Sequence, residues 1–189
     1  MGIYLCRHGE TEWSKSGRHT GLTDIPLTKT GEEQAALMAK PLQKIHFVKT
    51  FMSPRLRARQ TSELAGCHSE IDPDLAEWDY GDFEGLTSLE IKTKHPNWNL
   101  FIDGAPGGET PEQVGARADR VLKKLYHLDT PIAIFSHGHF CRILAVRYLG
   151  LPVSAGSLFY LDPASISHLG HEKSNHVIRL WNSIAHLDL

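Results

Sequence analysis

Three short β-prone runs, separated from one another by helical patterns, constrain the fold of this 189-residue chain most strongly. They occupy residues 3–6, 48–52 and 132–136, and the third is apolar until its final serine. Apolar strands that alternate with helices are typical of a largely parallel sheet covered by helices on both faces. In such sheets, ligands bind outside the carboxyl ends of the strands. The sequence therefore predicts an α/β fold with its site where these runs end.

Helix signals lie between and beyond the runs. Thr28 is the expected N-cap of a helix over residues 28–44, whose apolar positions recur at helical spacing. Thr110 and Gln113 form a capping box with Pro111 at the first helical position, which predicts a helix ending near residue 126. The other expected elements are helices over residues 55–65, 88–94 and 141–149, a strand over 176–181, and a loop-rich section over 66–109.

Composition indicates a globular protein, and we expect residues 1–189 to form a single domain. Hydrophobic residues make up 41% and charged residues 22%, with a net charge of −2. This charge gives no general attraction to nucleic acid or to an anionic membrane, and we recognise neither a secretory signal nor a membrane-spanning run. Three scattered cysteines are typical of reduced thiols. We therefore expect a cytoplasmic protein that binds neither nucleic acid nor membrane, with its oligomeric state open.

Basic side chains follow the three runs at the predicted binding edge. Arg7 and His8 follow the first run, Arg55 and Arg57 follow the second, and His137 follows the third. Guanidinium groups match phosphate oxygens in bidentate geometry. Nearby positive charge favours the neutral form of His8, which is a competent nucleophile toward phosphorus. The pattern therefore predicts a phosphate pocket with His8 as the nucleophile.

Phosphoryl transfer also needs a proton for the leaving oxygen. Glu77 is the best candidate, because it lies in a predicted loop beside aromatic residues that can desolvate its carboxyl group. Asp79, Asp82 and Glu84 are rivals on the sequence alone.

Six ordered blocks resemble the histidine phosphatase superfamily, also called phosphoglycerate mutase-like. The blocks are residues 6–11, 20–28, 53–61, 77–85, 107–110 and 136–138. The resemblance covers nearly the whole chain and implies a three-layer α/β/α sandwich with a mostly parallel sheet. Within the superfamily, segments 11–17, 53–61 and 77–82 are most similar to sedoheptulose-bisphosphatase-like sugar phosphatases.

The resemblance also implies a role for each matching residue. His8 would become phosphohistidine, and Glu77 would donate the proton and then activate water. Arg7, Arg57 and His137 would complete the phosphate pocket. Substrate contacts are expected at Ser14, Thr20, Gly21, Arg55, Tyr80, Gly138 and His139.

Three of these substrate contacts stay open at this point. Ser14 replaces the asparagine common in the family, and His139 stands where a mutase usually has asparagine. Arg55 has two equal interpretations, which are the binding of a second phosphate and the covering of a helix surface.

The resemblance implies a phosphatase that hydrolyses small phosphomonoesters, sugar phosphates or bisphosphates, without a metal or other cofactor. Three alternatives stay open, namely a phosphoglycerate mutase, a non-catalytic phosphate-binding module on the same fold, and a metal-dependent hydrolase. The chain lacks the long insertion with paired arginines that mutases carry, which favours hydrolysis. Cys141 and Arg147 have the spacing of cysteine phosphatases, but the residues between them include no glycine and favour a helix. Cys141 is therefore expected in the core.

Overall fold

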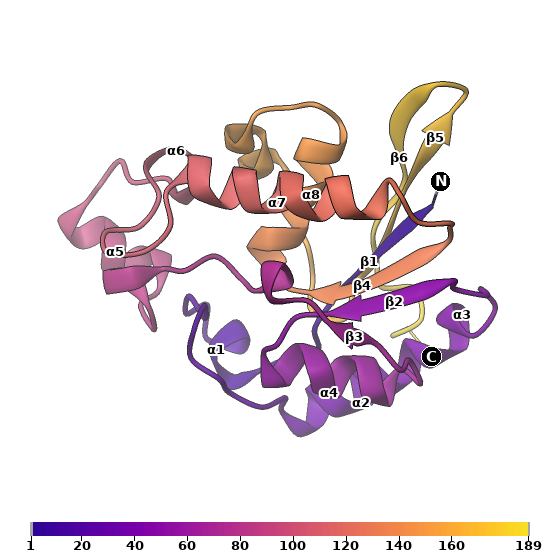
Figure 1. Ribbon diagram of the computed structural model, residues 1–189. Coiled ribbons are helices and arrows are strands. Elements are labelled where there is room, and N and C mark those ends of the chain that lie inside the picture. The colour runs from indigo at the N-terminus through magenta and orange to yellow at the C-terminus, as the bar shows by residue number, and fades with distance from the viewer. Residues whose placement is uncertain (1, 189) are drawn as a thin grey trace.

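Parallel strands form the centre of the computed structural model, which describes residues 2–188 (Figure 1). The three predicted runs become β1 (Ile3–Arg7), β2 (Lys49–Met52) and β4 (Ile132–Ser136). β4 pairs in parallel with β1 on one side and β2 on the other. All five residues of β4 are buried, because the strand has neighbours on both edges and helices on both faces. This position accounts for its nearly continuous apolar sequence.

Three further strands complete the sheet in the order β3-β2-β4-β1-β5-β6. β3 (Glu70–Ile71) adds a short parallel edge beside β2. β5 (Ile166–Glu172) and β6 (Asn175–Ser183) form an antiparallel hairpin that joins the sheet through β1. Three of the five pairings are parallel, which confirms the mostly parallel sheet. The expected strand over 176–181 lies inside β6, whereas β3 and β5 were not delimited from the sequence.

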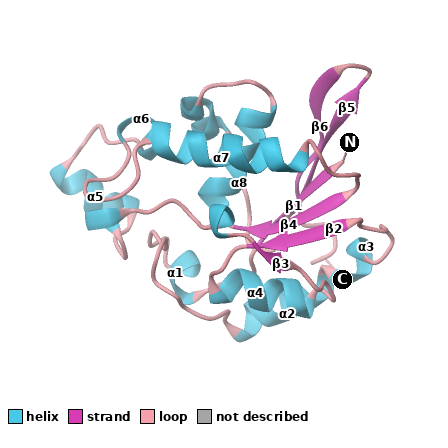
Figure 2. Ribbon diagram, in the orientation of Figure 1, coloured by secondary structure: helices cyan, strands magenta, loops and turns pink. Residues whose placement is uncertain are grey.

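Helices cover both faces of the sheet and form the outer layers of the sandwich (Figure 2). On one side lie α2 (Lys29–Leu37), α3 (Ala39–Leu42) and α4 (Leu56–Leu64), and on the other α7 (Pro111–Leu125) and α8 (Gly138–Tyr148). Successive side chains of a strand point to opposite faces, so Ala133 and Phe135 pack in one apolar cluster and Ile132 and Ile134 in the other. The three-layer α/β/α architecture expected from the sequence is confirmed.

Most of the predicted helix boundaries are confirmed, because the N-terminal capping hydrogen bonds that define them are present. Thr28 accepts a hydrogen bond from the Gly31 amide at 3.0 Å, and Thr110 and Gln113 make the expected capping box. The prediction of a single helix over residues 28–44 is wrong, because the segment forms two helices, α2 and α3, and the second ends at Leu42. Pro41 lies in α3, and it lacks the amide hydrogen that would continue the ladder.

Short elements surround the carboxyl ends of the strands, where Figure 1 shows α5 and α6. α1 (Glu12–Lys15) and α6 (Leu100–Asp103) were not predicted, whereas α5 (Ser88–Lys94) lies where a helix was expected. Three 3₁₀ turns, at Pro73–Leu75, Gly81–Phe83 and Val153–Leu158, complete the described elements.

α8 begins at Gly138, three residues before the predicted start of the last helix at residue 141. Its first amides therefore lie at the edge where β1 and β4 end. In residues 2–188, no helix combines the length and the apolar character that crossing a membrane requires.

Candidate active site

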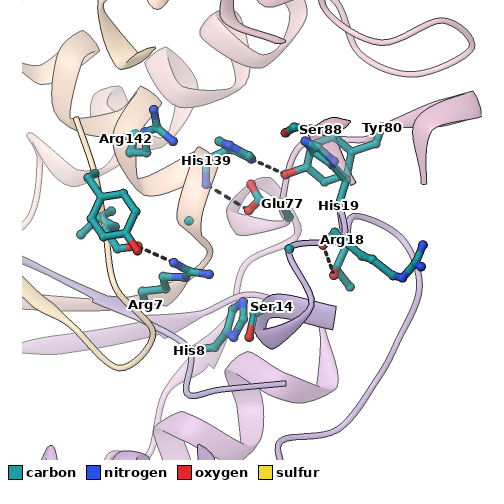
Figure 3. Close-up of a pocket in the computed structure, with 15 residues that line it drawn as sticks. Arg7, His8, Ser14, Arg18, His19, Glu77, Tyr80, Ser88, His139 and Arg142 are labelled. Atoms are coloured by element: carbon teal, nitrogen blue, oxygen red, sulfur yellow. Dashed lines mark hydrogen bonds between the residues drawn. The ribbon is translucent and has the colours of Figure 1, made fainter. Parts of the chain in front are cut away.

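A cavity of about 360 Å³ lies at the carboxyl ends of β1 and β4, next to the first turn of α8 (Figure 3). Eight of the twelve predicted site residues line it. They are Arg7, His8, Ser14, Thr20, Glu77, Tyr80, Gly138 and His139. The binding edge expected from the strand pattern therefore contains a cavity. The two strands that end at it, β1 and β4, are neighbours in the sheet.

His8 is held in one tautomer and in its neutral form. Its Nδ1–H donates to the Gly9 carbonyl at 2.7 Å, which leaves the lone pair on Nε2. Burial lowers the pKa of His8 well below its usual value, and the charges of Arg57 and Arg7 lower it further. The backbone amide of His8 donates to Ser136 of β4 at 3.0 Å, so the residue is fixed to the sheet. An unprotonated imidazole Nε2 is the form required of a nucleophile.

Arg57 and His137 form a buried pair beside His8, behind the residues that line the cavity. Arg57 Nε donates to His137 Nδ1 at 3.2 Å. Because arginine keeps its protons, His137 must accept there, carry its proton on Nε2 and donate to Ser53 Oγ at 2.7 Å. Burial and the charge of Arg57 lower the pKa of His137 well below its usual value. The other Arg57 nitrogens donate to the carbonyls of Thr20, Gly21 and Thr23.

Arg7 is the basic side chain next to His8 on the cavity wall. One of its terminal nitrogens donates to the Leu161 carbonyl, while Nε is buried and has no partner among the described residues. A side chain at position 138 would place its Cβ 3.3 Å from Arg7 Nε and Cζ, so glycine lets α8 start against the guanidinium. An oxygen of a bound phosphate would satisfy the unpaired Arg7 Nε–H.

Glu77 lies at the N-terminus of α8 and accepts hydrogen bonds from three backbone amides. Oε1 accepts from Trp78 at 2.9 Å and Phe140 at 2.8 Å, whereas Oε2 accepts only from His139 at 3.0 Å. Oε2 therefore keeps a lone pair that can take and give a proton. Among the described residues that line the cavity, Glu77 is the sole acidic one.

The three rival carboxyl groups lie outside the cavity lining. Glu84 accepts from the amides of Gly21 and Thr23, and Asp79 accepts from the Gly81 amide at 3.0 Å. Asp82 is exposed. Glu84 and Asp79 therefore stabilise the backbone of these loops.

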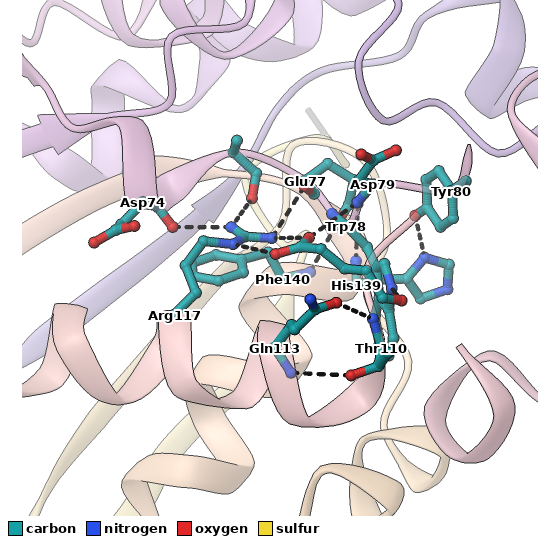
Figure 4. A network of polar contacts seen from close by, with 12 residues as sticks. Asp74, Glu77, Trp78, Asp79, Tyr80, Thr110, Gln113, Arg117, His139 and Phe140 are labelled. Carbon is teal, nitrogen blue, oxygen red and sulfur yellow. Dashed lines mark hydrogen bonds and ion pairs between the residues drawn. The ribbon is translucent and has the colours of Figure 1, made fainter. Parts of the chain in front are cut away.

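An ion pair between the buried Arg117 and the partly buried Glu109 supports the segment that carries Glu77 (Figure 4). Arg117 of α7 makes two hydrogen bonds to Glu109, at 2.8 and 2.6 Å. Its nitrogens also donate to the carbonyls of Asp74, Ala76 and Glu77. Sequence reasoning missed Arg117, although a signal exists, because this arginine interrupts the apolar stripe of α7 between Val114 and Val121. A charge in such a stripe indicates a buried partner.

The structure places two predicted substrate contacts away from the cavity lining. Gly21 donates its amide to Glu84 at 2.9 Å and accepts from Arg57 at 3.2 Å, so both of its backbone groups are engaged. Arg55 stands at the N-cap of α4, and its buried Nε has no partner among the described residues. The structure therefore does not bring Arg55 to the cavity that holds His8.

Other predicted contacts meet one another on the cavity wall. Tyr80 and His139 share a hydrogen bond of 2.5 Å between the phenol oxygen and Nδ1. Burial raises the pKa of Tyr80 and lowers that of His139, so both groups are neutral. The Ser14 hydroxyl is engaged in a capping box with Thr11. Lining residues missed from the sequence are Gly17, Arg18, His19, Ser88, Arg142, Tyr160 and Leu161.

Two observations concern thiolate and metal chemistry. Cys141 is fully buried within α8, and burial raises the pKa of its thiol to about 12, which confirms its predicted place in the core. In residues 2–188, no group of three or more His, Cys, Asp or Glu side chains is arranged to hold a metal ion.

Known proteins resemble this chain in sequence and in structure. Residues 3–184 match the model of the histidine phosphatase superfamily, branch 1. An acid phosphatase of Mycobacterium tuberculosis is 43% identical, over 90% of this chain and 86% of its own. Sedoheptulose 1,7-bisphosphatase of Saccharomyces cerevisiae is 38% identical, over 79% of this chain and 68% of its own.

A solved structure shares the fold over nearly its whole length. The product of an open reading frame from Mycobacterium tuberculosis superposes with a TM-score of 0.93 and 39% identity, covering 96% of each chain. Together with the family match over residues 3–184, this shows that the chain belongs to the histidine phosphatase superfamily.

Proposed function

We propose that this protein is a phosphatase that hydrolyses small phosphomonoesters, among them sugar phosphates or bisphosphates, through a phosphohistidine on His8. In the first step, His8 Nε2 attacks phosphorus and the bond to the ester oxygen breaks. Glu77 gives its proton to that oxygen, and the alcohol leaves. In the second step, Glu77 takes a proton from water, the hydroxyl attacks phosphorus, and the phosphorus–nitrogen bond breaks to release inorganic phosphate.

The observation that carries this proposal is the tautomer of His8. The Gly9 carbonyl accepts a hydrogen bond from Nδ1–H, so the nucleophilic lone pair lies on Nε2 without any proton transfer. Glu77 lines the same cavity with one lone pair of Oε2 unused. A phosphate-binding module has no need of a proton donor there, so the carboxyl group favours catalysis.

Arginine side chains supply the charge that the transferring phosphoryl group requires. Arg7 lines the cavity with an unpaired Nε–H, and Arg57 lies behind it against His137. Fixed donors of this kind stabilise charge that develops in the transition state and need little reorganisation. We therefore infer a reaction that needs no metal or other cofactor.

Replacement of the nucleophile tests the proposal. We expect His8→Ala to abolish phosphate release from p-nitrophenyl phosphate and sugar phosphates while the fold stays intact, because the covalent route is lost. Wild-type enzyme quenched during turnover should carry a phosphoryl group that is labile in acid and stable in base. His127→Ala is the matched control, because His127 is exposed and outside the cavity lining. A wild-type rate in His8→Ala would exclude this mechanism.

Product analysis separates hydrolysis from mutase chemistry. With 3-phosphoglycerate as substrate, a phosphatase releases inorganic phosphate and glycerate, whereas a mutase forms 2-phosphoglycerate. We expect phosphate release. We also infer a cytoplasmic location, which the three free cysteines support.

A further inference from the structure

A buried hydroxyl group of α4 holds the backbone that follows β1. Thr61 is fully buried and does not line the active-site cavity. The Gly9 amide donates to Thr61 Oγ1 at 3.0 Å, and the Thr61 hydroxyl donates to the Arg57 carbonyl at 2.7 Å. A threonine hydroxyl within a helix can donate to the carbonyl four residues earlier, which leaves its oxygen free to accept. Thr61 therefore links α4 to the residue that follows His8.

Gly9 packs backbone against backbone on the start of α2. A Cβ atom at Gly9 would clash with the carbonyl oxygen of Gly31, and one at Gly31 would clash with the carbonyl oxygen of Glu10. Glycine permits this close approach, but it also has the widest choice of backbone dihedral angles. Hydrogen bonds from neighbouring elements are therefore needed to hold the backbone at Gly9 in one conformation.

Two helices on the same face of the sheet, α2 and α4, hold the peptide groups on either side of Gly9 (Figure 1). The peptide before it is held at its amide by Thr61. The peptide after it carries the Gly9 carbonyl, and its amide, that of Glu10, donates to Gln34 Oε1 at 3.0 Å. The Gly9 carbonyl accepts the hydrogen bond from His8 Nδ1. If Gly9 turned, the imidazole would lose this acceptor and would be free to carry its proton on either nitrogen.

We propose that Thr61 is a positioning residue for the nucleophile, because its hydroxyl fixes Gly9 and thereby keeps the proton of His8 on Nδ1. The inference rests on the phosphatase function proposed above, in which His8 Nε2 attacks phosphorus. The role concerns the attack and not the binding of phosphate, since the side chains of Arg7 and Arg57 are independent of the Thr61 hydroxyl. A misplacement of the reacting atoms by about 1 Å costs roughly a hundredfold in rate.

Truncation of Thr61 to alanine tests this role by steady-state kinetics. We expect Thr61→Ala to lower kcat/KM for p-nitrophenyl phosphate about ten- to a hundredfold, because His8 is no longer held for attack. The inhibition constant of inorganic phosphate should stay unchanged, because Thr61 is not among the residues that line the cavity. Thr61→Ser keeps the hydroxyl and should retain the wild-type kcat/KM.

The tautomer of His8 gives a second measurement, which does not depend on turnover. In protein labelled with isotopic nitrogen in its histidines, NMR at neutral pH shows which ring nitrogen carries the proton, and His8→Gln identifies the signals of His8. We expect a protonated Nδ1 in the wild type and a mixture of both tautomers in Thr61→Ala. A pure Nδ1–H tautomer in Thr61→Ala would overturn the assignment. Activity retained in His8→Ala would contradict the proposed function, whereas the tautomer still tests the contact with Thr61.

The matched control is Ser62→Ala, at the next residue of the same helix. Ser62 is equally buried, but its hydroxyl donates to the Cys67 carbonyl at 3.0 Å and lies 2.7 Å from the Ser69 hydroxyl. This variant should keep kcat/KM and the His8 tautomer, even where thermal unfolding shows a loss of stability as large as in Thr61→Ala.

Three kinetic results would overturn the role of the Thr61 hydroxyl. They are a wild-type kcat/KM in Thr61→Ala, an equal loss in Ser62→Ala, and a loss in Thr61→Ser as large as in Thr61→Ala. If thermal unfolding shows that Thr61→Ala does not fold, Thr61→Val fills the space without a hydroxyl and is judged by the same criteria.

Discussion

At the scale of single residues, the carboxyl group of Glu77 determines how much activity its replacement removes. Glu77→Gln keeps the size of the side chain and removes the exchangeable proton of the carboxyl group. General acid–base catalysis contributes roughly 10²–10⁴-fold, so we expect kcat on a sugar phosphate to fall by about that factor. The loss should be smaller on p-nitrophenyl phosphate, whose leaving group needs less protonation. Steady-state phosphate release on the two substrates measures this difference.

Asp79→Asn and Asp82→Asn are the controls for Glu77→Gln. Asp79 caps the Gly81 amide and Asp82 is exposed, and neither lines the cavity. A larger loss of kcat in either of them than in Glu77→Gln would assign the proton to a different carboxyl group.

Three histidines with strongly lowered pKa values make stability depend on pH in a defined direction. Burial lowers the pKa values of His8, His137 and His139 well below 6.5, the value expected in the unfolded chain. Below about pH 6.5 the unfolded chain takes up protons that the folded one does not. The free energy of unfolding therefore falls as pH drops through this range, by up to about 1.4 kcal/mol per pH unit for each histidine, and these groups add no pH dependence above it.

Urea unfolding between pH 7.5 and 5.5 measures this dependence. His8→Gln removes one of the three groups, so its free energy of unfolding should depend less steeply on pH than that of the wild type. An unchanged pH dependence in His8→Gln would show that His8 is not held neutral by the fold.

At the scale of elements, α7 holds the segment that carries Glu77, the proposed proton donor. Arg117→Met leaves Glu109 without its partner and frees three carbonyls, so we expect a loss of about 3–5 kcal/mol in the free energy of unfolding. The variant should also lose more kcat on a sugar phosphate than on p-nitrophenyl phosphate, because Glu77 loses its support. Urea unfolding and kinetics on the two substrates measure both effects.

Arg120→Gln is the control on the same helix and for the same segment. Arg120 pairs with Asp74 at 2.7 Å but is mostly exposed, and water screens such pairs. We expect no measurable change in stability or in leaving-group dependence. A leaving-group effect as large in Arg120→Gln as in Arg117→Met would argue against positioning by Arg117.

At the scale of the whole molecule, the sheet gathers enough cationic side chains at one edge for phosphoryl transfer. We expect activity to survive exhaustive treatment with chelator, because in the proposed mechanism Arg7 and Arg57 supply the charge that a cation would otherwise provide. Vanadate should inhibit, since it adopts the five-coordinate geometry of the transition state. Loss of activity with chelator, restored by zinc or magnesium, would place the protein among metal-dependent hydrolases.

Much of the fold follows from signals that are local in the sequence. The β-prone runs of β1, β2 and β4, and the caps at Thr28 and Thr110, depend on residues within a few positions of one another. Parallel strands end at one edge of a sheet, so the positions of Arg7 and His8 follow from the strand pattern. Their catalytic roles stay predictions until the variants are measured.

Tertiary structure alone decided the rest, because it depends on contacts between segments far apart in the chain. Arg142 lines the cavity because α8 begins directly after the end of β4. Arg117 donates to the Glu77 carbonyl, which is 40 residues away in the sequence. Arg55 follows β2 closely in the sequence, but its position at the N-cap of α4 leaves it outside the cavity lining. The sequence by itself determined the α/β layers and the candidate nucleophile and acid. Packing determined which other side chains share the cavity, since that choice depends on how helices dock and no short pattern encodes it.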